Sequence, residues 1–291
     1  AALRLFPGAP QVAVFDTAFF QGMPPESFLY PLPYALYEEL GLRKYGFHGT
    51  SHRYVSREVA RVLRKSPENL SCVTIHLGNG CSMAAIRRGR ALDTSLGLTP
   101  MAGLMMGTRC GDIDPAIPAF LARSKGLDIA TIDRMLNTES GLKGVCGVND
   151  MRDVHSLRAK GDPSAELALD MFAYRVKRFI GAYVAVVGPC DAVAFTAGIG
   201  ENDAEVRARC CGGLEHLGVA LDPERNQAVS GGQTTDISAP EATVRVLVVP
   251  TNEELEIALQ TLEVVAAETV SDRKEELEIG GLKMTQELVG V

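Results

Sequence analysis

The chain has 291 residues, of which 46% are hydrophobic and 22% charged, and its formal net charge is -7 at pH 7. This apolar content is enough for a buried core and argues against a disordered or fibrous chain. The negative charge disfavours general attraction to nucleic acids and to anionic membrane surfaces, so neither is expected as a partner. The longest uncharged apolar run, Phe179–Cys190, is interrupted by glycine and proline and is too short to cross a bilayer.

Cysteine usage indicates a reducing compartment. Seven cysteines form an odd set without a C-x-x-C pair, which predicts neither a disulfide framework nor a zinc site. The N-terminal residues lack the basic and apolar regions of a secretory signal. We therefore expect a soluble, cytoplasmic protein.

Strands alternate with helices along the chain, which predicts an α/β fold. In chain order we expect strand Gln11–Asp16, helix Pro33–Leu40, a helix from Thr50 or Ser51 to Lys65, strands Ser71–Leu77 and Ser82–Ile86, helices Pro115–Lys125, Asp128–Leu136 and Ser164–Val187, strand Asp191–Thr196, helix Asp203–Leu217, strand Thr243–Val249 and helix Asn252–Ala267. A chain that opens on a core strand suggests that an upstream segment is missing. Two Gly-rich stretches, Asp93–Pro115 and one that ends at Asp153, have no periodicity, and irregular segments of such length are usually functional.

Two glycine turns follow apolar strands. Gly78–Gly80 comes after one strand, and Gly198–Gly200 comes after another and leads into a helix. Glycines at these places allow backbone N–H groups to approach phosphate oxygens. Tight strand turns are the alternative interpretation, and the residues alone leave both open. No G-K-[ST] sequence is present, so neither turn is a Walker A motif.

Arg109 is a candidate anion-binding residue because it lies in the first Gly-rich stretch. A guanidinium there can spread charge over two oxygens of a phosphoryl group. An ion pair with Asp112 or Asp114 that stabilises the loop is the alternative.

His48 and His52 are four residues apart, a spacing that zinc sites use. No glutamate lies between them and no third ligand is near, so no metal is expected there. His48 precedes a predicted helix N-terminus, which is electropositive and suited to an anion. A structural role for this histidine is the alternative.

Acidic residues mark the ends of two predicted strands, where α/β folds place ligands. Asp16 ends the first, and Glu253 and Glu254 follow the last. Their alternative roles are a turn contact and helix capping. Asp150 and Arg152 could bind a ribose or base, or each other.

Taken together, several strings resemble the acetate kinase family. They are Val14–Phe19 (VFDTAF), Arg43–His52 (RKYGFHGTSH), His76–Gly80 (HLGNG), Asp93–Pro100 (DTSLGLTP), Gly107–Pro115 (GTRCGDIDP), Phe195–Asn202 (FTAGIGEN) and Thr251–Glu254 (TNEE). The resemblance implies a ribonuclease-H-like fold of the actin-like ATPase superfamily, with two related domains around a cleft, working as a homodimer. It also implies reversible transfer of the γ-phosphoryl group of ATP to acetate, with Mg²⁺ or Mn²⁺, giving acetyl phosphate and ADP.

The resemblance also assigns roles by position. It implies that Asp16, His48 and Arg109 are catalytic and that Glu253 helps to hold the metal. The residues that it places around the nucleotide are His76, Leu77, Gly78, Asn79, Gly80, Asp150, Met151, Arg152, Gly198, Ile199, Gly200, Glu201 and Asn202.

The chemistry of such a reaction fits these residue types. A carboxylate acceptor is already ionised at pH 7, so no general base is needed to make it nucleophilic. Catalysis must then come from positive charge and in-line positioning around a loose transition state. We therefore expect Asp16 to orient the shell of the metal or a cationic side chain rather than to remove a proton.

Several departures from the family pattern bear on activity. The family's Asn- and Ser-rich phosphate loop and its acetate-binding arginine have no counterpart, Phe20 and Gly22 stand where His and Thr are common, and the loop Val148–Asp150 is one residue shorter. We expect residues 1–17 to be a remnant strand of the missing N-terminal domain, 18–253 to be the nucleotide-binding domain, and 254–291 to be a helix and tail that dock on the missing domain. A fragment of this kind should turn over very weakly. A propionate or butyrate kinase of the same family and a non-catalytic nucleotide-binding fragment are the alternatives.

Overall fold

The computed structural model describes residues 2–278, and their side chains as far as residue 267. The chain divides into two compact units. Asp16–Asn252 forms the larger unit, and the other combines Ala1–Phe15 with Glu253–Val291. The larger unit contains the sheet, and every candidate site residue except Glu253 and Glu254 lies in it.

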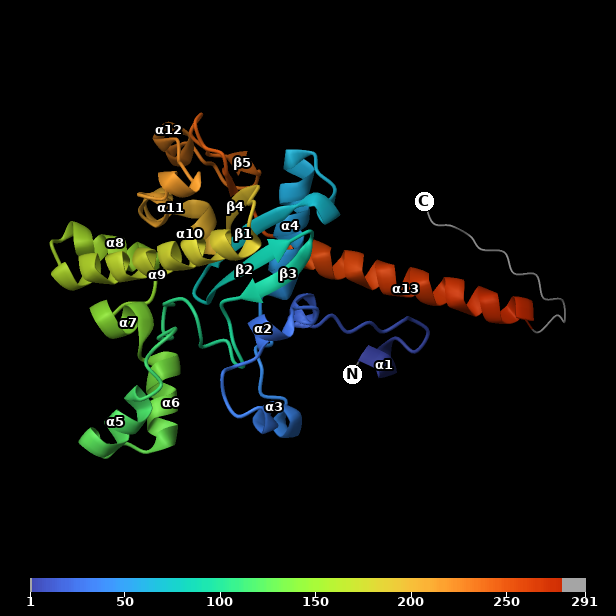
Figure 1. The fold of residues 1–291 in the computed structure, drawn as a ribbon, viewed down its shortest axis with the longest axis horizontal. Coiled ribbons are helices and arrows are strands. Elements are labelled where there is room, and N and C mark those ends of the chain that lie inside the picture. Colours follow the sequence, from blue (N-terminus) through green and yellow to red (C-terminus); the bar gives the residue numbers. More distant parts are fainter. Residues whose placement is uncertain (1, 279–291) are drawn as a thin grey trace. The chain divides into compact units, whose positions relative to one another are not determined.

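The larger unit is built on a six-stranded sheet with strand order β3-β2-β1-β4-β6-β5 (Figure 1). The strands are β1 (Ser71–Leu77), β2 (Cys81–Arg87), β3 (Arg90–Thr94), β4 (Ala192–Thr196), β5 (Thr235–Asp236) and β6 (Arg245–Val248). The central strands β1, β4 and β6 are parallel, whereas β2 pairs antiparallel with β1, β3 pairs antiparallel with β2, and β5 pairs antiparallel with β6. The α/β fold expected from the sequence is confirmed.

Helices cover both faces of this sheet, as the near-continuous apolar strands require. On one face, Val73 and Ile75 of β1 belong to the same hydrophobic cluster as Phe172 of α9 (Pro163–Val187). On the other, Cys72 belongs to the cluster that contains Val55 of α4 (Gly49–Leu63). Alternate residues of one strand thus belong to two cores, with α9 packed on one face of the sheet and α4 on the other.

Shorter helices complete the larger unit. They are α2 (Pro25–Phe28), α3 (Ala35–Leu40), α5 (Ile117–Lys125), α6 (Ile129–Thr138), α7 (Gly141–Cys146), α8 (Met151–Ala159), α10 (Ala197–Asn202), α11 (Ala204–Cys211) and α12 (Pro223–Gln227). Gly41 ends α3 with a left-handed φ of 63°, the conformation expected of a glycine at a helix C-terminus.

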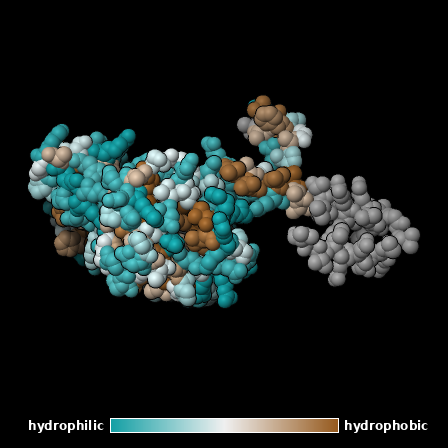
Figure 2. Space-filling model, turned by 90° about the horizontal axis from the view of Figure 1, so that it is seen from above, coloured by the Kyte–Doolittle hydropathy of each residue, from teal (hydrophilic) through white to brown (hydrophobic). Residues whose placement is uncertain are grey.

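The smaller unit contains α1 (Ala2–Leu5) and α13 (Glu253–Glu278). Hydrophobic side chains of α13 are exposed, among them Leu255 and Leu262. Figure 2 shows the hydropathy of the surface in brown and teal. The role predicted for residues 254–291 in docking on a further domain stays a prediction, and residues 279–291 lie outside the described part. No helix in that part is long and apolar enough to span a membrane.

Some predicted elements are wrong. Gln11–Asp16 forms no strand, because its backbone has no neighbouring strand among the described residues, and Phe15 is 67% exposed. The helix expected from Thr50 or Ser51 begins at Gly49, because His48 occupies its N-cap. The second Gly-rich stretch is not one loop, since α7 lies in it and α8 begins at Met151.

Two further corrections concern glycines. The helix expected over Asp203–Leu217 ends at Cys211, where Gly212 and Gly213 interrupt it. Gly198–Gly200 lies inside the short helix α10 and is not a free turn. Strands β3 and β5 were not expected from the sequence, because each is short and carries charged residues.

Candidate active site

The two glycine segments lie beside each other at one end of the sheet. β1 and β4 are parallel neighbours, and His76, the last residue but one of β1, pairs with Thr196, the last residue of β4. A Cβ atom built on Gly78 would lie 4.0 Å from the Cβ of Ala197. The topology therefore brings together two segments that are far apart in the sequence, as the nucleotide-binding interpretation requires.

Arg109 and His48 converge on Gly80, the last residue of the first glycine turn. A Cβ atom on Gly80 would lie 3.3 Å from Nη1 of Arg109 and 3.6 Å from Nε2 of His48. The guanidinium is held by the carbonyl of Pro100, which accepts from Nη1 at 3.1 Å. Glycine at position 80 therefore lets the guanidinium and the imidazole approach the backbone closely.

The ion-pair interpretation of Arg109 is wrong. No ion pair within the described part of the chain involves Arg109. The carboxylates of Asp112 and Asp114 accept instead from backbone N–H groups, those of Gly103 and Ala116. The charge of Arg109 is therefore not neutralised by either of these acids.

Asn79 connects the first glycine turn to the loops around it. Its carbonyl accepts from Gly107 N–H at 3.1 Å, and its side-chain oxygen accepts from the Asn149 amide at 3.2 Å. A Cβ atom on Gly107 would lie 2.1 Å from that oxygen. The turn, the Arg109 loop and the segment before Asp150 are thus held together.

Asp16 fixes the backbone of His48. Its carboxylate accepts the His48 N–H at 2.6 Å, and its carbonyl accepts the Gly49 N–H at 2.9 Å. His48 has a φ of 57°, a left-handed conformation that costs energy in a residue with a side chain. The turn contact considered for Asp16 is therefore present, and its action on a metal or a cation stays a prediction.

Three histidine rings lie close together next to this turn. The rings of His48 and His76 stack with their centroids 4.2 Å apart, and His52 packs beside His76. Burial lowers the pKa of His76 to about 3. Burial also lowers the pKa of His52 well below its ordinary value, and the neighbouring histidines lower it further. Both rings are therefore neutral at pH 7.

Hydroxyl groups, which the sequence analysis did not single out, hold these rings. Ser82 Oγ lies 2.8 Å from Nδ1 of His48 and 2.7 Å from Nε2 of His52. Thr74 Oγ1 lies 2.7 Å from the other nitrogen of His52. A signal was present in the sequence, because Thr74 and Ser82 are polar residues inside apolar strands.

Helix α10 carries the second glycine segment and has its own internal support. The carboxylate of Glu201 accepts from the Ala197 N–H at 2.8 Å and from the Thr251 N–H at 3.1 Å. Ala197 has a φ of 65°, which these contacts stabilise. Nothing lies within 4 Å of the position that a Cβ on Gly198 would take, so the surface there is open.

Arg207 is a buried residue that sequence reasoning missed. It donates from Nη1 to the carbonyls of Gly200 and Glu201, and from Nε and Nη2 to the side chain and carbonyl of Asn226. Burial lowers its pKa. This arginine acts through the C-terminal turn of α10, which it fixes in place.

Some predicted nucleotide residues can act only through their backbone. The side chains of Leu77 and Met151 are buried in the hydrophobic core. Asp150 and Arg152 bind each other, with Nε and Nη2 of Arg152 at 2.9 and 2.6 Å from the carboxylate. Hydrogen bonds from Arg152 lower the pKa of Asp150 to about 2. Of the two alternatives for this pair, mutual binding is present in the structure.

The predicted metal ligand Glu253 is the first residue of α13 and belongs to the smaller unit. Its relation to the glycine turns stays a prediction. Among the described residues, no group of three or more histidine, cysteine, aspartate or glutamate side chains could hold a metal ion.

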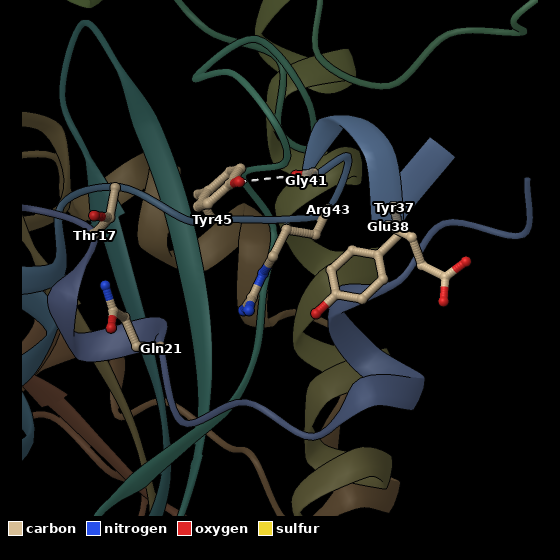
Figure 3. Close-up of a pocket in the computed structure, with 7 residues that line it drawn as sticks. All are labelled: Thr17, Gln21, Tyr37, Glu38, Gly41, Arg43 and Tyr45. Atoms are coloured by element: carbon tan, nitrogen blue, oxygen red, sulfur yellow. Dashed lines mark hydrogen bonds between the residues drawn. The ribbon is translucent and has the colours of Figure 1, made fainter. Parts of the chain in front are cut away.

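A separate cavity of about 470 Å³ lies elsewhere in the larger unit (Figure 3). Its lining residues are Thr17, Gln21, Tyr37, Glu38, Gly41, Arg43 and Tyr45. The guanidinium of Arg43 lies 3.8 Å from the centre of the Phe28 ring, a cation–π contact. None of the predicted site residues lines this cavity.

The chain has well-defined relatives. Residues 1–259 match the sequence profile of the acetokinase family. A curated acetate kinase from Nitratidesulfovibrio vulgaris strain DP4 is 60% identical over 264 residues, which are 91% of this chain and 65% of the relative. The chain thus spans less than two thirds of the length of this relative.

Solved structures of high similarity have the same fold. The acetate kinase of Porphyromonas gingivalis superimposes with a TM-score of 0.88 at 45% identity, over 91% of this chain and 66% of that one. A propionate kinase from Francisella tularensis superimposes with a TM-score of 0.83 at 46% identity, over 88% of this chain and 65% of that one.

Proposed function

The chain belongs to the acetokinase family, and from that premise we propose that it takes part in the reversible transfer of the γ-phosphoryl group of ATP to acetate. The products are acetyl phosphate and ADP. The observation that carries the proposal is the convergence of Arg109 and His48 on Gly80, beside the ends of the parallel strands β1 and β4.

The chemistry of the reaction explains why positive charge is placed there. Acetate is already ionised at pH 7, and the phosphoryl group that it attacks is also an anion. The protein must therefore reduce the repulsion between two anions and hold them in line. Arg109, which pairs with no acid among the described residues, supplies a fixed positive charge, and an N–H of His48 supplies a hydrogen bond.

We propose that the nucleotide lies along the two glycine segments. Gly80 and Gly198 have no side chain to block the approach of phosphate oxygens, and Asn79 holds the first turn against the Arg109 loop. The divalent cation arrives with ATP as part of the substrate, and a Mg²⁺ ion needs only one or two carboxylates besides phosphate and water. Glu253 is the carboxylate proposed for this role, and Asp16 is proposed to orient the shell of the metal or a cationic side chain.

The acid that accepts the phosphoryl group is proposed to be acetate. The curated relative with 60% identity is an acetate kinase, which favours acetate, whereas a propionate kinase structure at 46% identity supports the alternative. One methylene in a hydrophobic pocket changes binding by only about 1–3 kcal/mol, so a family member can accept both acids. Competition between acetate, propionate and butyrate in one assay would rank them.

The oligomeric state and the cellular location of the protein are also proposals. The family resemblance implies a homodimer, which sedimentation would test. A cytoplasmic location is supported by the cysteines, all of which are free in the structure.

The test is acetyl phosphate formation, trapped as the hydroxamate, by the chain and by the complete product of its gene, each with ATP, Mg²⁺ and acetate. We expect product from at least one of the two and a loss of two or more orders of magnitude in the Arg109→Gln variant, because removal of one donor to the transition state has roughly that effect. Arg225→Gln is the matched control, since Arg225 is an exposed residue that, among the described side chains, forms an ion pair with Asp222 alone. Absence of product from both proteins, or an Arg109→Gln variant as active as the control, would overturn the proposal.

A further inference from the structure

We infer that a buried chain of hydroxyl and imidazole groups, from Thr74 through His52 and Ser82 to His48, fixes the tautomer of His48 so that its Nε2 carries the proton. Ser82 and His52 are on this account positioning residues for His48. The geometric part of this inference stands alone, and its catalytic consequence rests on the proposed function.

The chain of contacts is continuous and buried. Thr74 Oγ1 meets Nδ1 of His52 at 2.7 Å, Nε2 of His52 meets Ser82 Oγ at 2.7 Å, and Ser82 Oγ meets Nδ1 of His48 at 2.8 Å. Thr74, His52 and Ser82 each have no solvent exposure. In such a place, each hydroxyl proton needs an acceptor within the protein.

The number of available protons allows only one direction of donation along these hydrogen bonds. Among the described contacts, the Thr74 hydroxyl meets only Nδ1 of His52, and the Ser82 hydroxyl meets only the two histidines. If His48 donated to Ser82 and His52 donated to Thr74, the Thr74 proton would have no acceptor. If both histidines donated to Ser82, the Ser82 proton would have none.

Only one arrangement uses both hydroxyl protons. Thr74 donates to Nδ1 of His52, Nε2–H of His52 donates to Ser82, and Ser82 donates to Nδ1 of His48. Because Nδ1 of His48 is then an acceptor, the ring proton must be on Nε2. His48 and His52, when neutral, are therefore both Nε2–H tautomers.

The proton on Nε2 of His48 matters because this nitrogen faces the candidate active site. Nε2 is the ring nitrogen of His48 that approaches the space over Gly80, 3.6 Å from the position of a Cβ there, with Nη1 of Arg109 on the same space at 3.3 Å. A proton on Nε2 makes His48 a hydrogen-bond donor toward that space without needing a positive charge. A bare Nε2 would instead present a lone pair to phosphoryl oxygens and repel them.

This inference predicts a tautomer that NMR can observe directly. In protein labelled with ¹⁵N in its histidine rings, long-range ¹H–¹⁵N correlation spectra at pH 7.5 distinguish a protonated ring nitrogen from a bare one. We expect His48 and His52 both to show protonated Nε2 and bare Nδ1. Protonated Nδ1 on either ring would overturn the inference, whether or not the chain has kinase activity.

A variant tests the role of Ser82. In Ser82→Ala, we expect the Nδ1 resonance of His48 to shift because it loses its donor, whereas His155, which binds Asp203, should not change. Ser238→Ala is the matched control, since Ser238 is equally buried and contacts Asp236 and Val246. An unchanged His48 resonance in Ser82→Ala would contradict the contact.

Kinetics of the active protein separate positioning from folding. We expect Ser82→Ala to lower kcat roughly tenfold, the effect typical of removing a residue that orients a functional histidine, with little change in KM for ATP. An equal loss of kcat in Ser238→Ala, or a change confined to KM, would contradict a positioning role.

Discussion

Replacement of Arg207 by leucine should destabilise the larger unit strongly. Arg207 is buried without a carboxylate partner and makes four hydrogen bonds, all to the carbonyls of Gly200 and Glu201 and to Asn226. A hydrogen bond from a charged donor contributes about 1.5–3 kcal/mol, so four contribute at least about 6 kcal/mol. Removing a buried charge recovers several kcal/mol of desolvation, which leaves a net loss of about 3–4 kcal/mol.

The loss in the free energy of unfolding can be measured from the urea concentration at the midpoint of unfolding, provided that the slope of the transition with urea does not change. Arg225→Leu is the control, because the side chain of Arg225 is 56% exposed and its ion pair with Asp222 should contribute less than about 1 kcal/mol. A difference between Arg207→Leu and wild type as small as that of the control would refute the reasoning. It would show that water replaces the guanidinium at these carbonyls.

Three other predictions follow from single contacts. Gly49→Ala should lower the free energy of unfolding by more than about 2 kcal/mol and disturb His48, because its Cβ would lie 2.2 Å from the carbonyl oxygen of Asp16. Gly22→Ala, which has open space around it, should leave the free energy of unfolding unchanged in the same assay. His76 has a folded pKa of about 3, below its unfolded value, so the free energy of unfolding falls as the pH drops below about 6.5. His76 should contribute about 2 kcal/mol to the fall in the free energy of unfolding between pH 7.5 and pH 5. An equally large fall in His76→Gln would contradict this. Burial raises the pKa of four thiols, those of Cys72, Cys81, Cys210 and Cys211. These thiols should react with Ellman's reagent at pH 8 only after unfolding. Rapid reaction of all seven thiols in the native chain would argue against their burial.

The sequence predicted the central strands because they follow from local pattern. Ser71–Leu77 was predicted with the bounds that β1 has, since a continuous apolar run bounded by glycine is typical of a buried strand. The same pattern failed at Gln11–Asp16, where composition favours a strand but the residues that the structure describes supply no neighbouring strand. Strand formation depends on a neighbour, which periodicity cannot reveal.

The candidate site was predictable in its charged and glycine residues but not in its supports. Arg109, His48 and Gly80 stood out because a cation and glycines in irregular segments are unusual. Ser82 and Arg207 did not, because a hydroxyl in a strand and an arginine in a helix are common, and their roles depend on contacts between distant segments. The choice between an ion pair and an open site for Arg109 also needed the structure.

The central claim is that nucleotide phosphates approach the main chain at the first glycine turn, and calorimetric titration of the chain with MgATP tests it most directly. We predict one binding site in the wild-type chain and an affinity at least about tenfold lower in Gly80→Ala, whose Cβ would lie 3.3 Å from Nη1 of Arg109, in the space proposed for phosphate. Gly22→Ala should bind like wild type. Binding of equal strength in Gly80→Ala and Gly22→Ala, or no binding by the wild-type chain, would contradict the account.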